Sequence, residues 1–273
     1  MKRVERSRPS PVEISRVFRL AQRAASLPDV QAEVEANHDN NRWWPTSITD
    51  TRMRMLAAGW STRVSYRMIT TYADVINAAD TRGFDTLATS TDAELTALIQ
   101  PIGLPRARIG YLRSLTDLLQ HWDKEAVSPT AADADTDELI RAFATHVRGA
   151  SYKVAQCALL YARGYHCGII PVDSGMVTRL APALGVPLPR GPVAHEQLRH
   201  LLEATAHTRA DDLRTLISKH QYDVKIPETA PPTWWLHLVL IYLKRLHLNR
   251  PSHRICPNRP VCLQTIDCPH TRP

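Results

Sequence analysis

The spacing of apolar residues is the feature that most constrains the fold of this chain. In nearly every segment these residues recur at the interval of one helix face, and alternating β-branched runs bounded by turns are missing. Proline-rich stretches such as "GVPLPRGPV" interrupt the pattern and indicate loops. The sequence therefore predicts an all-α protein, with helices over 11–26, 29–37, 49–58, 61–79, 91–99, 105–120, 136–146, 151–162, 174–184, 194–206, 210–220 and 233–246.

Composition limits the classes of partner. The chain has 273 residues, 44% of them apolar, which is enough for one large or two moderate hydrophobic cores. The 34 Lys and Arg residues outnumber the 27 acids, and the formal charge of +7 favours a polyanionic partner. The longest apolar run, "WWLHLVLIYL", is about half the length that crosses a bilayer, and the N-terminus lacks the apolar region of a secretory signal. We therefore expect a soluble cytoplasmic protein, nucleoid-associated if bacterial, with no membrane partner.

A short turn between two amphipathic helices is the first candidate site. In "DELIRAFATHVRGASYKVAQCALLYA", the turn "HVRGAS" joins two segments that each have an apolar face. A glycine near the apex of such a hairpin presents successive backbone N–H groups, and the following helix N-terminus adds its positive dipole end. The combination suits one DNA phosphate and binds it without reading sequence. The expected DNA contacts are Arg148, Gly149, Ala150 and Ser151.

These residues resemble the helix-hairpin-helix DNA glycosylases, a family that includes endonuclease III and 8-oxoguanine glycosylase. The family hairpin, roughly L-P-G-V-G-x-K-x-A, aligns with "VRGASYKVA", so Gly149 matches the first hairpin glycine and Lys153 the catalytic lysine. The segment "PVDSGMVTRLA" resembles the family's V-D-x-H-x-x-R, which assigns the catalytic aspartate to Asp173. Upstream, "PIGLPRARIGYLRSLTDLLQ" is similar to a stretch of endonuclease III. The resemblance runs, with gaps, from 46 to 184.

The resemblance implies a two-domain helical protein. A six-helix barrel would span 46–166 and include the helix-hairpin-helix at about 136–162. The second domain would combine 1–45 with 167–273. The implied partner is double-stranded DNA that contains a damaged or modified base, bound by a monomer. Oxidised pyrimidines, 8-oxoguanine and an unusual modified base all stay open as substrates.

The implied activity is base excision with associated AP lyase chemistry. A lysine attacks the anomeric carbon only as a neutral amine, and the helix dipole and partial burial expected at Lys153 both disfavour the ammonium. A carboxylate such as Asp173 would stabilise the positive charge that develops on the sugar. Two alternatives are a monofunctional glycosylase, in which Asp173 activates water, and a non-catalytic DNA-binding protein. For each residue alone, a solvent-facing lysine and a plain N-cap aspartate are the simpler interpretations.

Two departures from the family pattern lie in the hairpin. Ser151 stands where the family usually has a second glycine, and Arg148 stands where it usually has proline. Because serine tolerates positive φ poorly, we expect either a reshaped hairpin or a Ser151 hydroxyl that contacts the phosphate.

A glycosylase that flips a base out of duplex DNA must fill the gap with a side chain. The family often takes this wedge from the loop that corresponds to "LAAGWSTRVSY", which makes Trp60, Ser61 and Arg63 candidates. Core packing is the favoured interpretation of Trp60. The pair Trp43 and Trp44 could stack on a flipped base, but we favour packing for both.

Five cysteines complete the candidate residues. Cys256, Cys262 and Cys268 crowd into one short segment, which suggests metal rather than disulfides. Endonuclease III holds an iron–sulfur cluster with C-x6-C-x2-C-x5-C at the same place, and the last interval matches here. The first interpretation is a 4Fe–4S cluster with a fourth ligand such as His253 or His270, and the alternatives are a Cys3His zinc site or a metal-free tail. Cys157 and Cys167 are expected to be core or loop residues.

Overall fold

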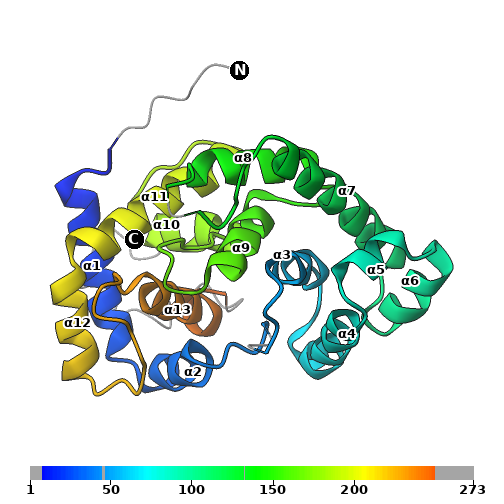
Figure 1. The fold of residues 1–273 in the computed structure, drawn as a ribbon. Helices are drawn as coiled ribbons and strands as arrows, with labels where there is room; N and C mark the ends of the chain where they lie inside the picture. Colours follow the sequence, from blue (N-terminus) through cyan, green and yellow to red (C-terminus); the bar gives the residue numbers. More distant parts are fainter. Residues whose placement is uncertain (1–7, 45–46, 132, 250–273) are drawn as a thin grey trace. The chain divides into compact units, whose positions relative to one another are not determined.

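The computed structural model describes residues 8–44, 47–131 and 133–249. Every element in these ranges is a helix, which confirms the all-α class (Figure 1). The chain divides into two compact units. We call Asn40–Tyr165 the hairpin unit, and the combination of Met1–Asp39 with His166–Pro273 the terminal unit. The expected domain bounds, 46–166 for the barrel and 1–45 with 167–273 for the second domain, stay a prediction.

The hairpin unit is built around α9. Its described helices are α3 (Thr51–Trp60), η1 (Tyr66–Met68), α4 (Ile69–Arg82), α5 (Phe84–Thr89), α6 (Asp92–Ile99), η2 (Gln100–Ile102), α7 (Pro105–Lys124), α8 (Thr136–His146) and α9 (Tyr152–Arg163). Every residue of α9 from Val154 to Ala162 is buried, and the helix packs against α3 and α8. Gly164, at φ 91°, ends it because glycine adopts positive φ without strain.

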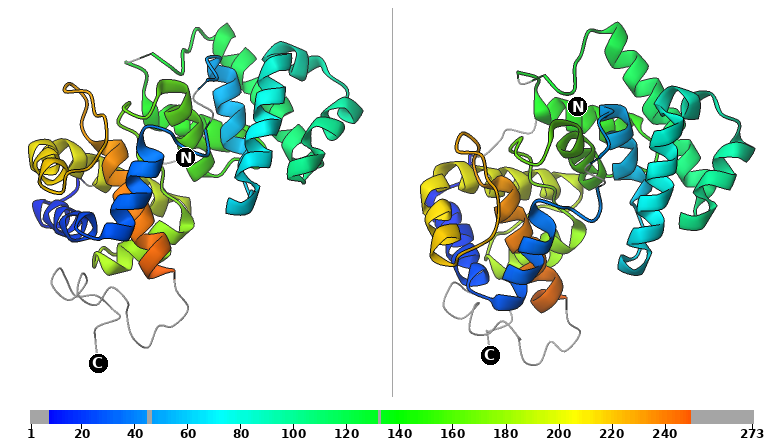
Figure 2. Two further views of the ribbon diagram at one scale, coloured as in Figure 1. Left: turned by 90° about the horizontal axis from the view of Figure 1, so that it is seen from below. Right: turned by 60° about the horizontal axis from the view of Figure 1, so that its bottom comes forward.

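The terminal unit is built around α13. Its described helices are α1 (Pro11–Ala25), α2 (Pro28–His38), the π-helical segment η3 (Met176–Leu180), α10 (Ala181–Ala183), α11 (Pro192–Thr208), α12 (Ala210–Lys219), α13 (Thr233–Leu243) and a second π-helical segment η4 (Lys244–Leu248). All of α13 is buried, and α1, α2 and α11 pack on it. Figure 2 shows this orange helix beside the blue α2. The apolar run "WWLHLVLIYL" is thus a core helix, and no described helix could span a membrane.

One expected helix boundary is clearly wrong. The helix expected over 61–79 begins only at Ile69, after a turn and the short η1. The hydroxyls of Ser61 and Thr62 donate to the Ala58 and Gly59 carbonyls at the end of α3, and the next residue, Arg63, has φ 57°. Side-chain bonds of this kind compete with the helix ladder, so the chain turns here. By contrast, the helix expected over 136–146 is confirmed as α8, which Asp135 caps.

The contact of α3 with α7 gives a stability prediction. A Cβ on Gly59 would lie 2.1 Å from the Tyr111 ring, whose hydroxyl donates to the Met55 carbonyl (2.9 Å). Gly59→Ala should therefore lower the free energy of unfolding by about 1–3 kcal/mol, as overpacking does. The matched control is Gly110→Ala, where the nearest atom is 3.8 Å away. There alanine should be neutral or stabilise by up to ~1 kcal/mol. Urea unfolding measures both, and equal effects would contradict the packing described here.

Candidate functional site

The hairpin between α8 and α9 is closed by backbone hydrogen bonds. The Val147 N–H donates to the Phe143 carbonyl at the end of α8 (3.0 Å), and the Ala150 N–H donates to the Val147 carbonyl (3.1 Å). Gly149 has φ 78°, a conformation that favours glycine. This geometry explains why the first hairpin glycine matches the family pattern.

A second contact ties the hairpin to α7. The backbone N–H of Arg148 donates to the hydroxyl of Ser114 (2.8 Å), which is largely buried. Proline at position 148 could not make this bond because it has no N–H. The absence of proline at position 148 therefore permits a backbone hydrogen bond that ties the turn to α7.

Ser151 caps α9. Its backbone is extended, with φ −87° and ψ 170°, and its hydroxyl accepts from the Val154 N–H at 3.4 Å. Serine thus replaces the second hairpin glycine without adopting positive φ, so the backbone at Ser151 is not strained. The hydroxyl acts as an N-cap, which accounts for the serine without a phosphate contact.

Lys153 lies in the first turn of α9. The first N–H groups of a helix have no intrahelical partner, so those at Tyr152 and Lys153 can donate hydrogen bonds to an anion. Gly149 and Ser151 are exposed, and Lys153 is half-buried. The hairpin thus offers backbone donors and an amine on one element. Phosphate binding by the donors and nucleophilic attack by the amine stay predictions.

Asp173 follows a buried segment of the terminal unit. The Ile170 N–H in this segment donates to the Glu203 carboxylate (3.0 Å), and Arg199 pairs with Glu203 at 2.8 Å. Burial raises the pKa of Glu203, and the Arg199 guanidinium opposes that rise. Arg199 pairs with Glu196 as well (2.7 Å). The network on α11 fixes the chain that leads to Asp173.

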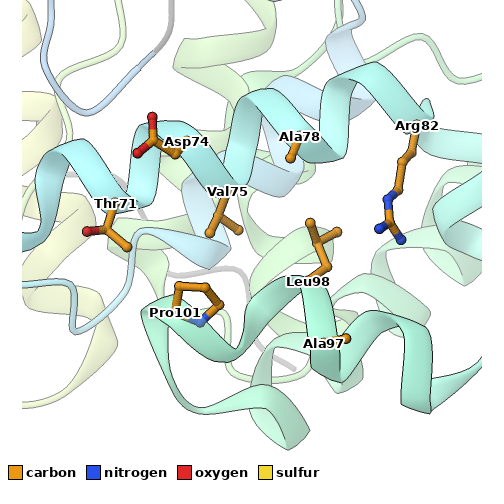
Figure 3. A pocket seen from close by; sticks show the side chains of 8 residues that line it. All are labelled: Thr71, Asp74, Val75, Ala78, Arg82, Ala97, Leu98 and Pro101. Atoms are coloured by element: carbon orange, nitrogen blue, oxygen red, sulfur yellow. The ribbon is translucent and has the colours of Figure 1, made fainter.

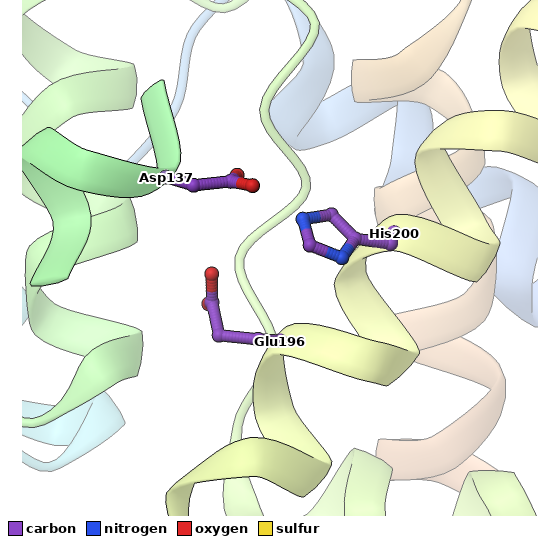
Figure 4. A group of neighbouring side chains, drawn as sticks. All are labelled: Asp137, Glu196 and His200. Carbon is purple, nitrogen blue, oxygen red and sulfur yellow. The ribbon is translucent and has the colours of Figure 1, made fainter. Parts of the chain in front are cut away.

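Glu196 and His200 lie on successive turns of α11 (Figure 4). Arg199, between them in sequence, contacts the His200 Nε2 at 2.8 Å as well as the Glu196 carboxylate. The two side chains are therefore partners of a buried guanidinium within the terminal unit.

Both carboxylate oxygens of Asp173 are engaged. Oδ1 accepts from the Met176 N–H (2.7 Å) at the start of η3, and Oδ2 accepts from the Nζ of Lys244. The side chain of Lys244 is 5% exposed and that of Asp173 is 29% exposed. Sequence analysis missed Lys244. The sequence does place a lysine directly after the apolar run "WWLHLVLIYL", where burial is expected. A buried ammonium requires a partner of opposite charge.

The two predicted catalytic residues belong to different units. Lys153 is part of the hairpin unit, and Asp173 is part of the terminal unit. Their cooperation in one reaction is therefore a prediction, and the geometry of each is established only within its own unit.

Trp60 is a core residue, which corrects its place among the DNA contacts. It is fully buried, and its indole N–H donates to the Arg108 carbonyl (3.1 Å). A side chain in this position is not available to DNA. Ser61 contributes its hydroxyl to the end of α3, whereas Arg63 is exposed and stays a candidate contact.

The adjacent tryptophans Trp43 and Trp44 also pack against other side chains. Trp44 is 6% exposed and lies against Tyr161, with ring centroids 5.3 Å apart. Trp43 is half-buried and lies near Tyr66 and Tyr72, with ring centroids 6.4 Å from each. The packing interpretation of both residues is confirmed.

Arg108 connects two loops of the hairpin unit. Although it lies in a basic stretch of sequence, it is 2% exposed. Its guanidinium donates to the carbonyls of Trp60 (3.1 Å), Thr62 (3.0 Å) and Gly103 (2.6 Å). Burial lowers the pKa of Arg108. This arginine is a structural anchor rather than part of a phosphate track.

The loop held through Gly103 presents an exposed leucine. Leu104 is 44% exposed and has φ 53° and ψ 44°, a left-handed conformation that is uncommon for leucine. It directly precedes α7. Sequence analysis missed this residue, and its signal was a large apolar side chain between glycine and proline in "IGLP". Strained residues of this kind cluster at functional sites.

A pocket of about 440 Å³ lies in the hairpin unit, between α4 and α6 (Figure 3). Figure 3 shows Val75 and Leu98 facing into it, with Asp74 and Arg82 beside them. None of the predicted site residues lines this pocket.

The cysteine tail lies outside the described residues. Cys256, Cys262 and Cys268 therefore stay a predicted metal site. Cys157 is a buried thiol in α9, and Cys167 is half-buried.

Comparison with known proteins gives a match by structure alone. No family model matches the sequence, and no curated protein matches it. Among solved structures, the 3-methyladenine DNA glycosylase MagIII of H. pylori, bound to 1,N6-ethenoadenine, matches with a TM-score of 0.56 at 14% identity. The match covers 84% of this chain and 97% of that one. The chain therefore has the helix-hairpin-helix DNA glycosylase fold, and the endonuclease III branch stays a prediction.

The cap of α9 gives the prediction for this site. Ser151→Ala should lower the free energy of unfolding by about 1 kcal/mol, and Ser151→Gly by only a few tenths (~0.3 kcal/mol). Both variants lack the hydroxyl, so affinity for duplex DNA should be the same in both and close to that of the wild type. Urea unfolding and fluorescence anisotropy measure the two quantities. An equal and large loss of DNA affinity in both variants would show that the hydroxyl contacts phosphate instead.

Proposed function

We propose that this protein is a base-excision DNA glycosylase that removes a damaged or modified base from double-stranded DNA. The observation that supports this most is the hairpin closed at Gly149, which occurs within a glycosylase fold and carries a lysine on the following helix. The H. pylori structure contains 1,N6-ethenoadenine. Alkylated and etheno-modified purines therefore join oxidised bases as substrates to test.

The hairpin would hold one phosphate next to the lesion. Gly149 and Ser151 are exposed and adjoin the free N–H groups of α9, and the chain has a formal charge of +7. Contacts to phosphate position the protein on the duplex without selecting a sequence. Selectivity would then depend on the extruded base.

Lys153 would be the nucleophile of the reaction. Its neutral amine would form a bond to the anomeric carbon while the bond to the base breaks and the base leaves with the bonding electron pair. Loss of a proton and opening of the sugar would give a Schiff base, and β-elimination would then cut the strand 3′ to the lesion. The ionised carboxylate of Asp173 would stabilise the positive charge on the sugar. In the monofunctional alternative, Asp173 activates water and Lys153 contacts phosphate.

Leu104 and Arg63 are the wedge candidates that the structure supports. Both are exposed and both have positive φ, and the buried Arg108 holds the two loops through the Thr62 and Gly103 carbonyls. Apolar side chains commonly enter unstacked base steps. Leu104 suits that role better than the buried Trp60.

Trapping with borohydride tests the role of Lys153. The wild-type protein, incubated with duplex that contains an abasic site, should form a covalent complex on reduction, because the reagent converts a Schiff base to a stable amine. Lys153→Gln should form none. The matched control is Lys124→Gln, which removes an exposed lysine at the end of α7 and should trap as the wild type does.

Two other outcomes have defined meanings. If the wild type releases a base but traps no complex, the monofunctional mechanism replaces the lysine mechanism. If the protein binds duplex but neither releases a base nor traps, the glycosylase proposal itself is wrong.

The wedge proposal predicts a difference between duplex and single-stranded substrates. Leu104→Ala should slow base release from duplex about tenfold or more, because the variant cannot compensate for a few kcal/mol of unstacking. Release from a single strand should be unchanged. The control Val127→Ala truncates another exposed apolar residue of the same unit and should affect neither. Equal slowing on both substrates would contradict the wedge role.

A further inference from the structure

Lys244 is a buried lysine with a specific partner. It is 4% exposed, at the point where α13 ends and η4 begins. Removal of an ammonium from water is costly unless an opposite charge and hydrogen bonds compensate for it. The carboxylate of Asp173 provides that compensation. The buried position of Lys244 is thus explained by its contact with Asp173, whereas a lysine that serves solubility would be exposed.

The carboxylate of Asp173 is held from two directions. The Met176 N–H donates to Oδ1 (2.7 Å), and the Lys244 ammonium donates to Oδ2. One oxygen would suffice for an ordinary N-cap. Two separate donors on different elements also set the orientation of the carboxylate plane. The second donor, on Oδ2, is not needed for the contact with the start of η3.

Gly175 leaves space for this pair. Its φ of −70° and ψ of −32° are helical, so the backbone does not require glycine there. A Cβ would lie 2.9 Å from the Lys244 Nζ, 3.2 Å from its Cδ and 3.3 Å from the Asp173 Oδ1. Glycine is disfavoured in helices relative to alanine. Its presence two residues after the aspartate therefore leaves room for the lysine to reach the carboxylate.

The pair also joins two π-helical segments. Asp173 accepts from the backbone N–H of Met176, the first residue of η3, Lys244 begins η4, and the two segments are in contact. Arg179 on η3 donates to the Leu248 carbonyl on η4 at 3.3 Å. Single π-helical turns are rare and are frequent at functional sites.

We propose that Lys244 is a positioning residue, whose ammonium holds the Asp173 carboxylate ionised and oriented for the charge that develops on the sugar. This role rests on the proposed glycosylase function. No proton is transferred and no covalent bond forms between the two residues. The lysine remains an ammonium and the aspartate a carboxylate throughout. Lys244 would thus be a second essential lysine, distinct from the nucleophile Lys153.

Other charges near the pair could also affect the carboxylate. Besides Lys244 itself, the titratable side chains on the elements that pack against η3 and η4, together with those on the two segments themselves, are Arg179, His195, Glu196, Arg199, His200, Glu203, His207, His237, Tyr242, Arg245 and His247. Of these, His247 pairs with Asp29 (3.0 Å), and Arg199 pairs with the two glutamates. Arg245 is exposed and follows Lys244 directly, so it provides a matched control for loss of one positive charge.

The test measures the carboxylate and the reaction separately. Selective 13C labelling of aspartate carboxyls, with Asp173→Asn for assignment, gives the pKa of Asp173 by NMR titration. Lys244→Met should raise that pKa, since an adjacent ammonium favours the charged form. The same variant should slow single-turnover base release about 10- to 100-fold, as misplacement of a reacting group does. Arg245→Met should change neither quantity.

Gly175→Ala provides a second route to the same result if Lys244→Met does not fold. The added methyl displaces the ammonium, so it should raise the Asp173 pKa and slow base release in the same direction. An Asp173 pKa that is equal in the wild type and in these variants would overturn the proposal. So would a raised pKa with unchanged base release. If the wild type releases no base at all, the proposed function fails and this role fails with it, whereas the titration would still report the ion pair.

Discussion

Helix N-termini determine where this protein places its candidate chemistry. Ser151 caps α9 with its hydroxyl, and Lys153 follows in the first turn. One carboxylate oxygen of Asp173 accepts from the Met176 N–H at the start of η3, and the other accepts from Lys244. In both places a side-chain oxygen accepts from a backbone N–H near the start of a helix, which fixes the direction of a functional group. These contacts join residues of one unit, so the surroundings of each side chain are described within its own unit.

Buried cations fix the segments between these helices. The Arg108 guanidinium donates to the carbonyls of Trp60, Thr62 and Gly103, Arg199 pairs with two glutamates of its own helix α11, and Lys244 pairs with Asp173. Each ion is costly to bury alone, and each is compensated by carbonyls or carboxylates beside it. The loops that hold Leu104 and Asp173 are therefore positioned by charge rather than by apolar contacts alone.

Helical spacing was sufficient to predict the fold class, because each amphipathic face needs a partner. The hairpin glycine could also be predicted, since Gly149 occupies the positive φ that the motif requires. Other features needed coordinates. Ser61 and Thr62 end α3 through hydroxyl contacts that periodicity does not show, which is why the helix expected over 61–79 began too early. The sequence showed the charge of Lys244 but not its ion pair with Asp173, which lies 71 positions away.

The central claim is that this chain excises bases, and the release of free base measures it most directly. Purified protein would be incubated with duplexes that contain 1,N6-ethenoadenine, 3-methyladenine, 8-oxoguanine or an oxidised pyrimidine, and the released base would be identified by mass spectrometry. The account predicts release from at least one duplex and a loss of about 100-fold or more in Asp173→Asn, which removes the stabilising charge. Intact DNA binding without release from any of these duplexes would contradict it.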